Sequence, residues 1–160
     1  MEEILQSFAW LVERPLVLMW LSVFFAGATY TDVKALKIPN KLNALLAVGN
    51  IALFVVYPLI QGNWNDSLYA VLSALIGFIA LLIPAVATGF KMAGDIKFIG
   101  ALGFAFHPAS MLAFLGIAVV LNIVTNGFLI VTKLKTFEAV IPFAPFFTSS
   151  FIILMLVTLI

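Results

Sequence analysis

Long apolar stretches separated by short polar segments dominate this chain. Uncharged segments occupy residues 15–31, 42–60, 68–90, 98–132 and 139–160. A helix needs about 20 apolar residues to cross a hydrocarbon core of about 30 Å, and four of the five segments suit one such helix each. Segment 98–132 has 35 residues, which would extend about 52 Å as a single helix. That is too long for one ordinary span.

A His107-Pro108 pair divides this longest segment. Proline disfavours the helical conformation in the residue before it, so we predict two helices joined by a tight turn at 106–109. The first of the two is short, over about 94–106. The pattern therefore predicts an all-α integral membrane protein with six transmembrane helices.

The distribution of charge supports this count. With six helices, the loops after the first, third and fifth share one side, and they hold every lysine of the chain: Lys34, Lys37, Lys41, Lys91, Lys97, Lys133 and Lys135. The opposite side holds Glu2, Glu3, Glu13, Arg14 and Asp66. Because cytoplasmic loops carry the excess of basic residues, we predict a cytoplasmic lysine side and both termini outside. Reading 98–132 as one span would send Lys133 and Lys135 outside.

Composition agrees with a membrane protein that has no separate soluble domain. Hydrophobic residues make up 64% of the chain and charged residues 9%, against roughly 25% charged in soluble domains. We expect one transmembrane domain over residues 1–160, in which 1–14 form either an interfacial helix or an outer extension of the first span. The absence of cysteine excludes disulfides, a thiol nucleophile and a cysteine zinc site. The sequence contains no nucleic-acid-binding surface, phosphate-binding loop or metal cluster.

Two of the three aspartates are expected at the same membrane edge. Asp32 lies in TYTDVKALKIPN and Asp95 in KMAGDIKF, both on the lysine side, whereas Asp66 lies in the polar turn QGNWNDS on the other side. Two carboxyl groups at close range share one proton, because both cannot easily be charged. One then takes a proton from water while the other polarises a peptide carbonyl. Such a pair hydrolyses peptide bonds without metal, serine or cysteine.

Other interpretations of these residues remain open from the sequence. Asp95 follows Gly94 at the start of a helix, where it could act as an N-cap. Asp32 could be neutralised by Lys34 or Lys37 at the end of its helix. The competing class is a non-catalytic transport or assembly subunit, whose ionisable residues usually lie near the bilayer midplane. The predicted spans contain no charge, which favours the protease. His107 is interpreted as a loop residue and Glu138 as an ion-pair partner of Lys135.

Three segments resemble the type IV prepilin peptidases, which are Gly-x-Gly-Asp membrane aspartyl proteases. TYTDVKALKIPN is similar to their first catalytic motif, with an aspartate ahead of a basic stretch and Ile-Pro-Asn. MAGDIKFIGALG resembles their second motif, and IPFAPFF resembles their Pro-Phe-Gly-Pro-Phe segment. The three matches occur in the family's order, and the resemblance covers about residues 26–160.

The resemblance implies a role for each matched residue. Asp32 and Asp95 correspond to the two catalytic aspartates. Gly94 corresponds to the second motif glycine, which allows close backbone approach, and Lys97 to the family's lysine, although it equally suits a positive-inside anchor. Met92 replaces the first motif glycine, which puts the loop geometry in question and is the one feature that favours an inactive member.

The remaining matched positions are of lesser weight. Ala144 stands where the family has glycine. Pro39 and Asn40 are interpreted as a turn that opens the second helix. We count Gly94, Lys97 and Met92 as the expected substrate-binding residues, and no metal or other cofactor is implied.

The resemblance also implies a substrate and a location. Bifunctional family members methylate the processed pilin with an added cytoplasmic domain that holds four cysteines, and this chain resembles the short peptidase-only branch of tight-adherence (Flp) pili instead. Archaeal preflagellin peptidases are the close alternative. The expected partners are a prepilin precursor and membrane lipids. The expected location is the inner membrane, with multiple passes and the active site facing the cytoplasm.

Overall fold

The computed structural model describes residues 8, 10, 11, 13–87, 92–134 and 141–159. Within these residues the fold consists of six helices and contains no strand. The second helix is continuous but changes winding, from α3 through a π-helical segment, η1, to α4. The elements in chain order are α2 (Pro15–Ala35), α3 (Asn40–Ile51), η1 (Ala52–Val56), α4 (Tyr57–Ile60), α5 (Trp64–Ala87), α6 (Ala93–Gly103), α7 (Pro108–Val131) and α8 (Ala144–Leu159).

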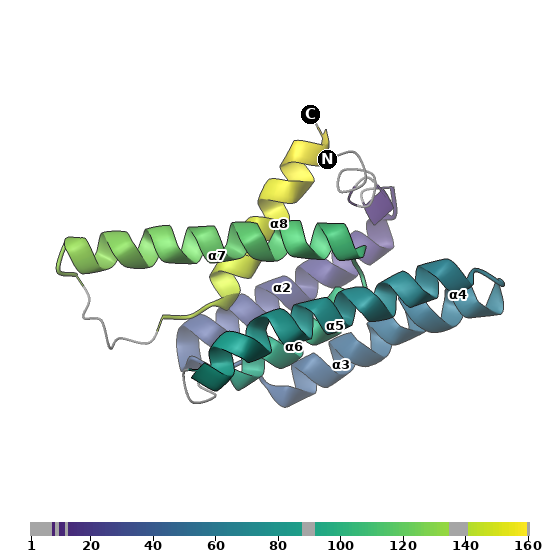
Figure 1. Cartoon of the computed structure of the whole chain (residues 1–160), viewed down its shortest axis with the longest axis horizontal. Helices are drawn as coiled ribbons and strands as arrows, with labels where there is room; N and C mark the ends of the chain where they lie inside the picture. Colours follow the sequence, from purple (N-terminus) through teal and green to yellow (C-terminus); the bar gives the residue numbers. More distant parts are fainter. Residues whose placement is uncertain (1–7, 9, 12, 88–91, 135–140, 160) are drawn as a thin grey trace.

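The helices form a bundle with two distinct ends (Figure 1). The α2–α3 connection and the start of α6 lie at one end, which we call the lysine end because Lys34, Lys37 and Lys97 belong to it. The turn between α4 and α5 and the turn between α6 and α7 lie at the other end, which we call the His107 end. The helix α8 packs against both α2 and α7, and it crosses α7 at a steep angle in Figure 1.

Six helices are confirmed within the described residues, but only some are long enough to span a membrane. Four are: Pro15–Ala35, Asn40–Ile60, Trp64–Val86 and Pro108–Val131. The helix α8 is apolar and shorter, with 16 residues. The helix α6 has 11 residues and packs against α3 and α5 inside the bundle. The chain is therefore a multi-pass membrane protein in which α6 is supported by longer helices.

The sequence pattern predicted where the chain turns between helices more accurately than the residues at which the helices begin. The chain does turn between Gly103 and Pro108, with Pro108 as the first residue of α7, where its missing N–H costs no hydrogen bond. The α5 helix starts at Trp64, earlier than the apolar run, because a first helical turn accepts polar residues. The α8 helix starts at Ala144 and not at 139, after an irregular segment at 141–143 that contains Pro142.

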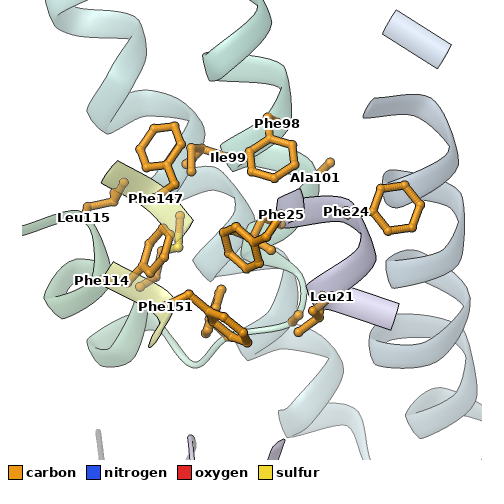
Figure 2. Packing of buried hydrophobic residues seen from close by; sticks show 14 of the residues in the cluster. Leu21, Phe24, Phe25, Phe98, Ile99, Ala101, Phe114, Leu115, Phe147 and Phe151 are labelled. Carbon is orange, nitrogen blue, oxygen red and sulfur yellow. The ribbon is translucent and has the colours of Figure 1, made fainter. Parts of the chain in front are cut away.

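Aromatic side chains fill the interior where α2, α6, α7 and α8 meet. The rings of Phe25 and Phe98 lie 5.8 Å apart, those of Phe25 and Phe151 4.6 Å apart, and those of Phe114 and Phe147 6.0 Å apart. Figure 2 shows these rings gathered around Phe25. Lipid tails are as apolar as the side chains, so helices in membranes associate mainly through close packing and interhelical hydrogen bonds. The interlocked rings provide that packing.

Polar side chains that are buried or partly buried connect the helices. Asn50 on α3 donates to the Ala101 carbonyl at 2.9 Å and accepts a hydrogen bond from Trp20 Nε1 at 3.0 Å. Thr29 on α2 and Thr148 on α8 are joined by a hydrogen bond of 2.7 Å. Each such bond in a membrane contributes on the order of 0.6 kcal/mol. Together they fix α2 relative to α3 and α8.

Several predictions concern residues outside the described part of the chain. These include the structure of residues 1–7, the positions of Lys91 and Lys135, and the proposed Lys135–Glu138 ion pair. The orientation of the termini relative to the membrane stays a prediction, as does the assignment of residues 1–160 to one domain.

Candidate active site

Asp32 lies in the last turn of α2 and is 4% exposed. Its Oδ2 accepts a hydrogen bond of 2.9 Å from the backbone N–H of Ala144, the first residue of α8. An anion is disfavoured at the C-terminus of its own helix, but it is favoured at the N-terminus of another, where the free N–H groups point outward. Asp32 therefore serves as a cap for α8 across 112 residues of sequence.

Asp95 lies in the first turn of α6 and is half-buried. Its Oδ1 is buried and accepts no hydrogen bond from the residues that the structure describes. The structure thus excludes the simplest alternative for this residue, because the N-cap of α6 is Met92 and no side-chain cap bond is formed there. An unpartnered buried carboxyl oxygen is costly, which makes Asp95 the more unusual of the two aspartates.

The two carboxyl groups interact electrostatically. Asp95 belongs to α6, outside the four membrane-length helices. Burial, together with the negative charge of Asp32, raises the pKa of Asp95 from 3.8 to about 7. Both effects favour the neutral acid, since burial penalises a charge and a nearby like charge adds to that penalty. The fold thus brings Asp32 and Asp95 together, although 63 residues separate them in the sequence.

Gly94 lies where the start of α6 meets the α2–α3 connection. A Cβ at this position would lie 3.2 Å from the backbone nitrogen of Ile38 and 3.3 Å from its carbonyl oxygen. The Gly94 carbonyl accepts a hydrogen bond of 3.1 Å from Nδ2 of Asn43, a buried residue on α3. The close backbone approach expected for this glycine is present, and it sets the position of Asp95 one residue further on.

Met92 and Lys97 occupy less critical positions. Met92 has φ −111° and ψ 25°, angles that need no glycine, and its side chain packs against the core. The replacement of glycine therefore introduces no backbone strain. Lys97 is exposed and donates a hydrogen bond of 3.1 Å to the side chain of Asn40 on α3, so it points away from the interior.

The assumption that no span contains a charge is wrong for three of the four membrane-length helices, since Asn40–Ile60 includes Lys41 and Trp64–Val86 includes Asp66, each in a first turn. The membrane-length helix Pro15–Ala35 includes Asp32 and Lys34, because helical geometry continues for four residues beyond the end of the apolar run. Asp32 still lies in the last turn and not at mid-helix. The absence of charge from the spans therefore no longer separates this protein from a transporter. What still separates them is that Asp32 lies near the lysine end of the bundle and not at the bilayer midplane.

The sequence did not indicate that the backbone N–H of Ala144 is the hydrogen-bond donor to Asp32. The resemblance identified IPFAPFF and noted alanine in place of glycine, but it gave Ala144 no contact with an aspartate. Every residue except proline carries an N–H, so no side-chain pattern marks this donor. The segment's two prolines, Pro142 and Pro145, indicated only that a helix would begin nearby.

The third aspartate behaves as expected. Asp66 is exposed in the first turn of α5 and accepts a hydrogen bond from the Asn63 side chain. Among the described residues, no cluster of three or more His, Cys, Asp or Glu is present that could hold a metal ion.

The structure is thus that of a helical membrane protein with two interacting carboxyl groups at one end of its bundle. A model of the type IV leader peptidase family matches residues 16–130. The chain belongs to this family, and membership implies proteolytic processing of prepilin-type precursors. The match includes Asp32 and Asp95, whereas IPFAPFF at 141–147 lies beyond it. No curated protein and no solved structure matches the chain.

Proposed function

We propose that the chain is a membrane-embedded aspartic endopeptidase that removes the leader peptide of a type IV prepilin of the Flp type, with Asp32 and Asp95 as its catalytic pair. The observation that carries this proposal is the buried, unpartnered Oδ1 of Asp95 beside the Asp32 carboxylate. A purely structural aspartate would be expected to have a donor for this oxygen. Family membership supplies the reaction class.

The two environments divide the chemical roles. Asp32, whose Oδ2 accepts a hydrogen bond from the Ala144 N–H, acts as the base, because Asp95 is the better proton donor of the two. Asp95, with its raised pKa, acts as the acid. Asp32 takes a proton from water, the water oxygen attacks the scissile carbonyl carbon, and Asp95 passes its proton to the carbonyl oxygen. Asp32 then protonates the leaving amine while Asp95 recovers its proton, and the peptide C–N bond breaks.

Substrate access requires local opening of the fold. Asp32 and Asp95 do not line the cavities of about 430, 480 and 450 Å³ that the described residues form, and Asp32 is 4% exposed. A peptide reaches the pair where the α2–α3 connection packs on Gly94. We place this opening at the cytoplasmic membrane boundary of the inner membrane, because the lysine end is the cytoplasmic one by charge. Gly94 and Met92 shape the opening, while Lys97 lies outside it.

The alternative of an archaeal preflagellin peptidase uses the same chemistry, and only the substrate distinguishes the two. A non-catalytic transport or assembly subunit is disfavoured because the carboxyl pair has no described lysine or arginine partner. Cleavage is therefore the deciding property.

Co-expression with a candidate prepilin tests the proposal. We compare wild type, Asp32→Asn, Asp95→Asn, the double variant and Asp66→Asn as a matched control. Wild type and Asp66→Asn should shorten the prepilin, while both single variants lose about a thousandfold or more in rate and the double variant loses no more than they do, because members of one catalytic unit are not additive. Cleavage by either single variant, with all five proteins present in the membrane, would exclude the pair mechanism.

A further inference from the structure

A cavity of about 430 Å³ lies at the His107 end, away from the aspartates. It is formed where the segment before α2, the η1–α4 segment, the start of α5 and the α6–α7 turn come together. This volume is within the range of small-ligand sites, about 300–1,000 Å³. None of the residues assigned to the catalytic site lines it.

One positive and one negative side chain line this cavity without forming an ion pair. Arg14 places its guanidinium carbon 4.1 Å from the centre of the Trp10 ring, which leaves the N–H groups of the guanidinium available. Asp66 accepts one hydrogen bond, from Asn63. Neither has an ion-pair partner among the residues that the structure describes. The cavity therefore presents separated charges of both signs.

Further features on the cavity wall favour a phosphate beside Arg14. The helices α5 and α7 both begin here, at Trp64 and Pro108, and helix N-termini carry partial positive charge. His107 lines the cavity, and its ring lies 4.7 Å from the Tyr69 ring at an interplanar angle of 59°. Its Nδ1 is buried and has no hydrogen-bond partner among the described residues.

The surroundings of the cavity match the depth of lipid headgroups. Tyr57, Trp64 and Tyr69 are 52%, 72% and 43% exposed at this end of the bundle, and exposed tyrosine and tryptophan are enriched at membrane–water interfaces. Leu53, which also lines the cavity, is 43% exposed. The cavity wall thus continues from charged groups to an apolar surface that an acyl chain can follow.

We propose that this cavity binds one phospholipid with an ethanolamine headgroup, with the phosphate on Arg14 and the primary ammonium on Asp66. A phosphate alone would be repelled by Asp66, and a headgroup with no cation would leave that carboxylate unpaired. A zwitterionic headgroup satisfies both residues, and a primary ammonium donates hydrogen bonds that a quaternary choline cannot. This inference does not depend on the cleavage chemistry.

Lipid retention tests the site. The full chain, purified in detergent, is titrated with phosphatidylethanolamine, phosphatidylcholine or phosphatidylglycerol of identical acyl chains, and bound lipid is counted by native mass spectrometry. Wild type should bind one phosphatidylethanolamine more tightly than either other lipid. Arg14→Gln should weaken this binding about tenfold, as expected for one charge-assisted contact, and Arg14→Lys should restore part of it. Lys133→Gln, which removes one charge at the opposite end, should leave the binding unchanged.

Asp66→Asn separates the zwitterion from a simple anion. This variant should lose the preference for phosphatidylethanolamine over phosphatidylglycerol while still retaining lipid. The proposal is overturned if wild type binds phosphatidylglycerol as tightly as phosphatidylethanolamine, if Arg14→Gln with an unchanged helical spectrum binds as wild type does, or if Lys133→Gln weakens the binding as much as Arg14→Gln does.

Discussion

The last turn of α2 and the first turn of α6 each supply one carboxyl group. The two groups differ in burial and in hydrogen bonding. Asp32 is almost fully buried but is held by a backbone N–H from α8. Asp95 is less buried, yet its Oδ1 has no described partner. Two identical side chains thus lie in different surroundings, and burial raises the pKa of Asp95 to about 7. The comparison teaches that the environment of Asp32 depends on α8, which contributes a backbone N–H and no acidic side chain of its own.

Among changes around the two aspartates, removal of the Ala144 N–H that donates to Asp32 should slow cleavage most. Ala144→Pro deletes the N–H at the first position of a helix, where proline is otherwise well tolerated. Loss of a hydrogen bond to a charged group costs about 1.5–3 kcal/mol, so we expect leader cleavage to slow by about tenfold to a hundredfold. The measurement is the initial cleavage rate of a purified prepilin.

Ala144→Gly is the matched control, because it keeps the N–H and shortens only the side chain. It should retain a rate within about threefold of wild type, a change of less than about 0.7 kcal/mol. Equal rates for the proline and glycine variants, at equal thermal stability, would show that the α8 contact does not support Asp32.

Displacing the Asp95 side of the pair should have a smaller effect. In Gly94→Ala the added Cβ meets the Ile38 backbone at 3.2–3.3 Å, so α6 or the α2–α3 connection must move by a few tenths of an ångström. Because catalysis is sensitive to such shifts, we expect the cleavage rate to fall about fivefold. Gly116→Ala on α7, where a Cβ meets nothing within 4 Å, should cleave like wild type. A rate loss in both variants would point to a general effect of glycine replacement.

The pH dependence of the free energy of unfolding should show the raised pKa of Asp95 in the absence of substrate. The folded-state pKa of Asp95, about 7, lies above the ordinary value of 3.8. Burial of this carboxyl group therefore does not lower the free energy of unfolding below pH 3.8. Between pH 3.8 and pH 7 it lowers the free energy of unfolding by an amount that grows with pH. Asp95→Asn removes this cost. The free energy of unfolding of Asp95→Asn should therefore exceed that of wild type by about 3 kcal/mol more at pH 8 than at pH 5. The difference arises over the two pH units between pH 5 and the pKa of about 7.

Unfolding in detergent at the two pH values measures this difference, with Asp66→Asn as the control for loss of an exposed carboxylate. A gain that is the same at both pH values would contradict the raised pKa of Asp95.

Sequence patterns predicted those features that local or topological rules determine. The break before Pro108 follows from the restricted backbone of His107, and the proximity of Asp32 and Asp95 follows from placing both at the lysine end of alternating helices. The contact between Ala144 and Asp32 could not be predicted, since it joins a backbone atom to a residue 112 positions away. The extension of α2 beyond Thr31 was missed because apolar runs mark membrane depth and not helix ends.

The His107 end shows the same limitation. Arg14, Asp66 and His107 looked like unrelated loop residues in the sequence, yet they line one cavity. Their grouping depends on how the α4–α5 and α6–α7 turns meet, which no motif in the chain indicates.

The pH dependence of cleavage by the purified wild-type protein tests the central division of roles most directly. Asp95 must be protonated to act as the acid, and its pKa is raised to about 7, so the rate should fall about tenfold per unit above pH 7. Returning the sample from pH 9 to pH 6.5 should restore the rate, and Lys97→Gln should show the same profile. A rate that stays constant or rises between pH 6 and pH 9 would contradict the account.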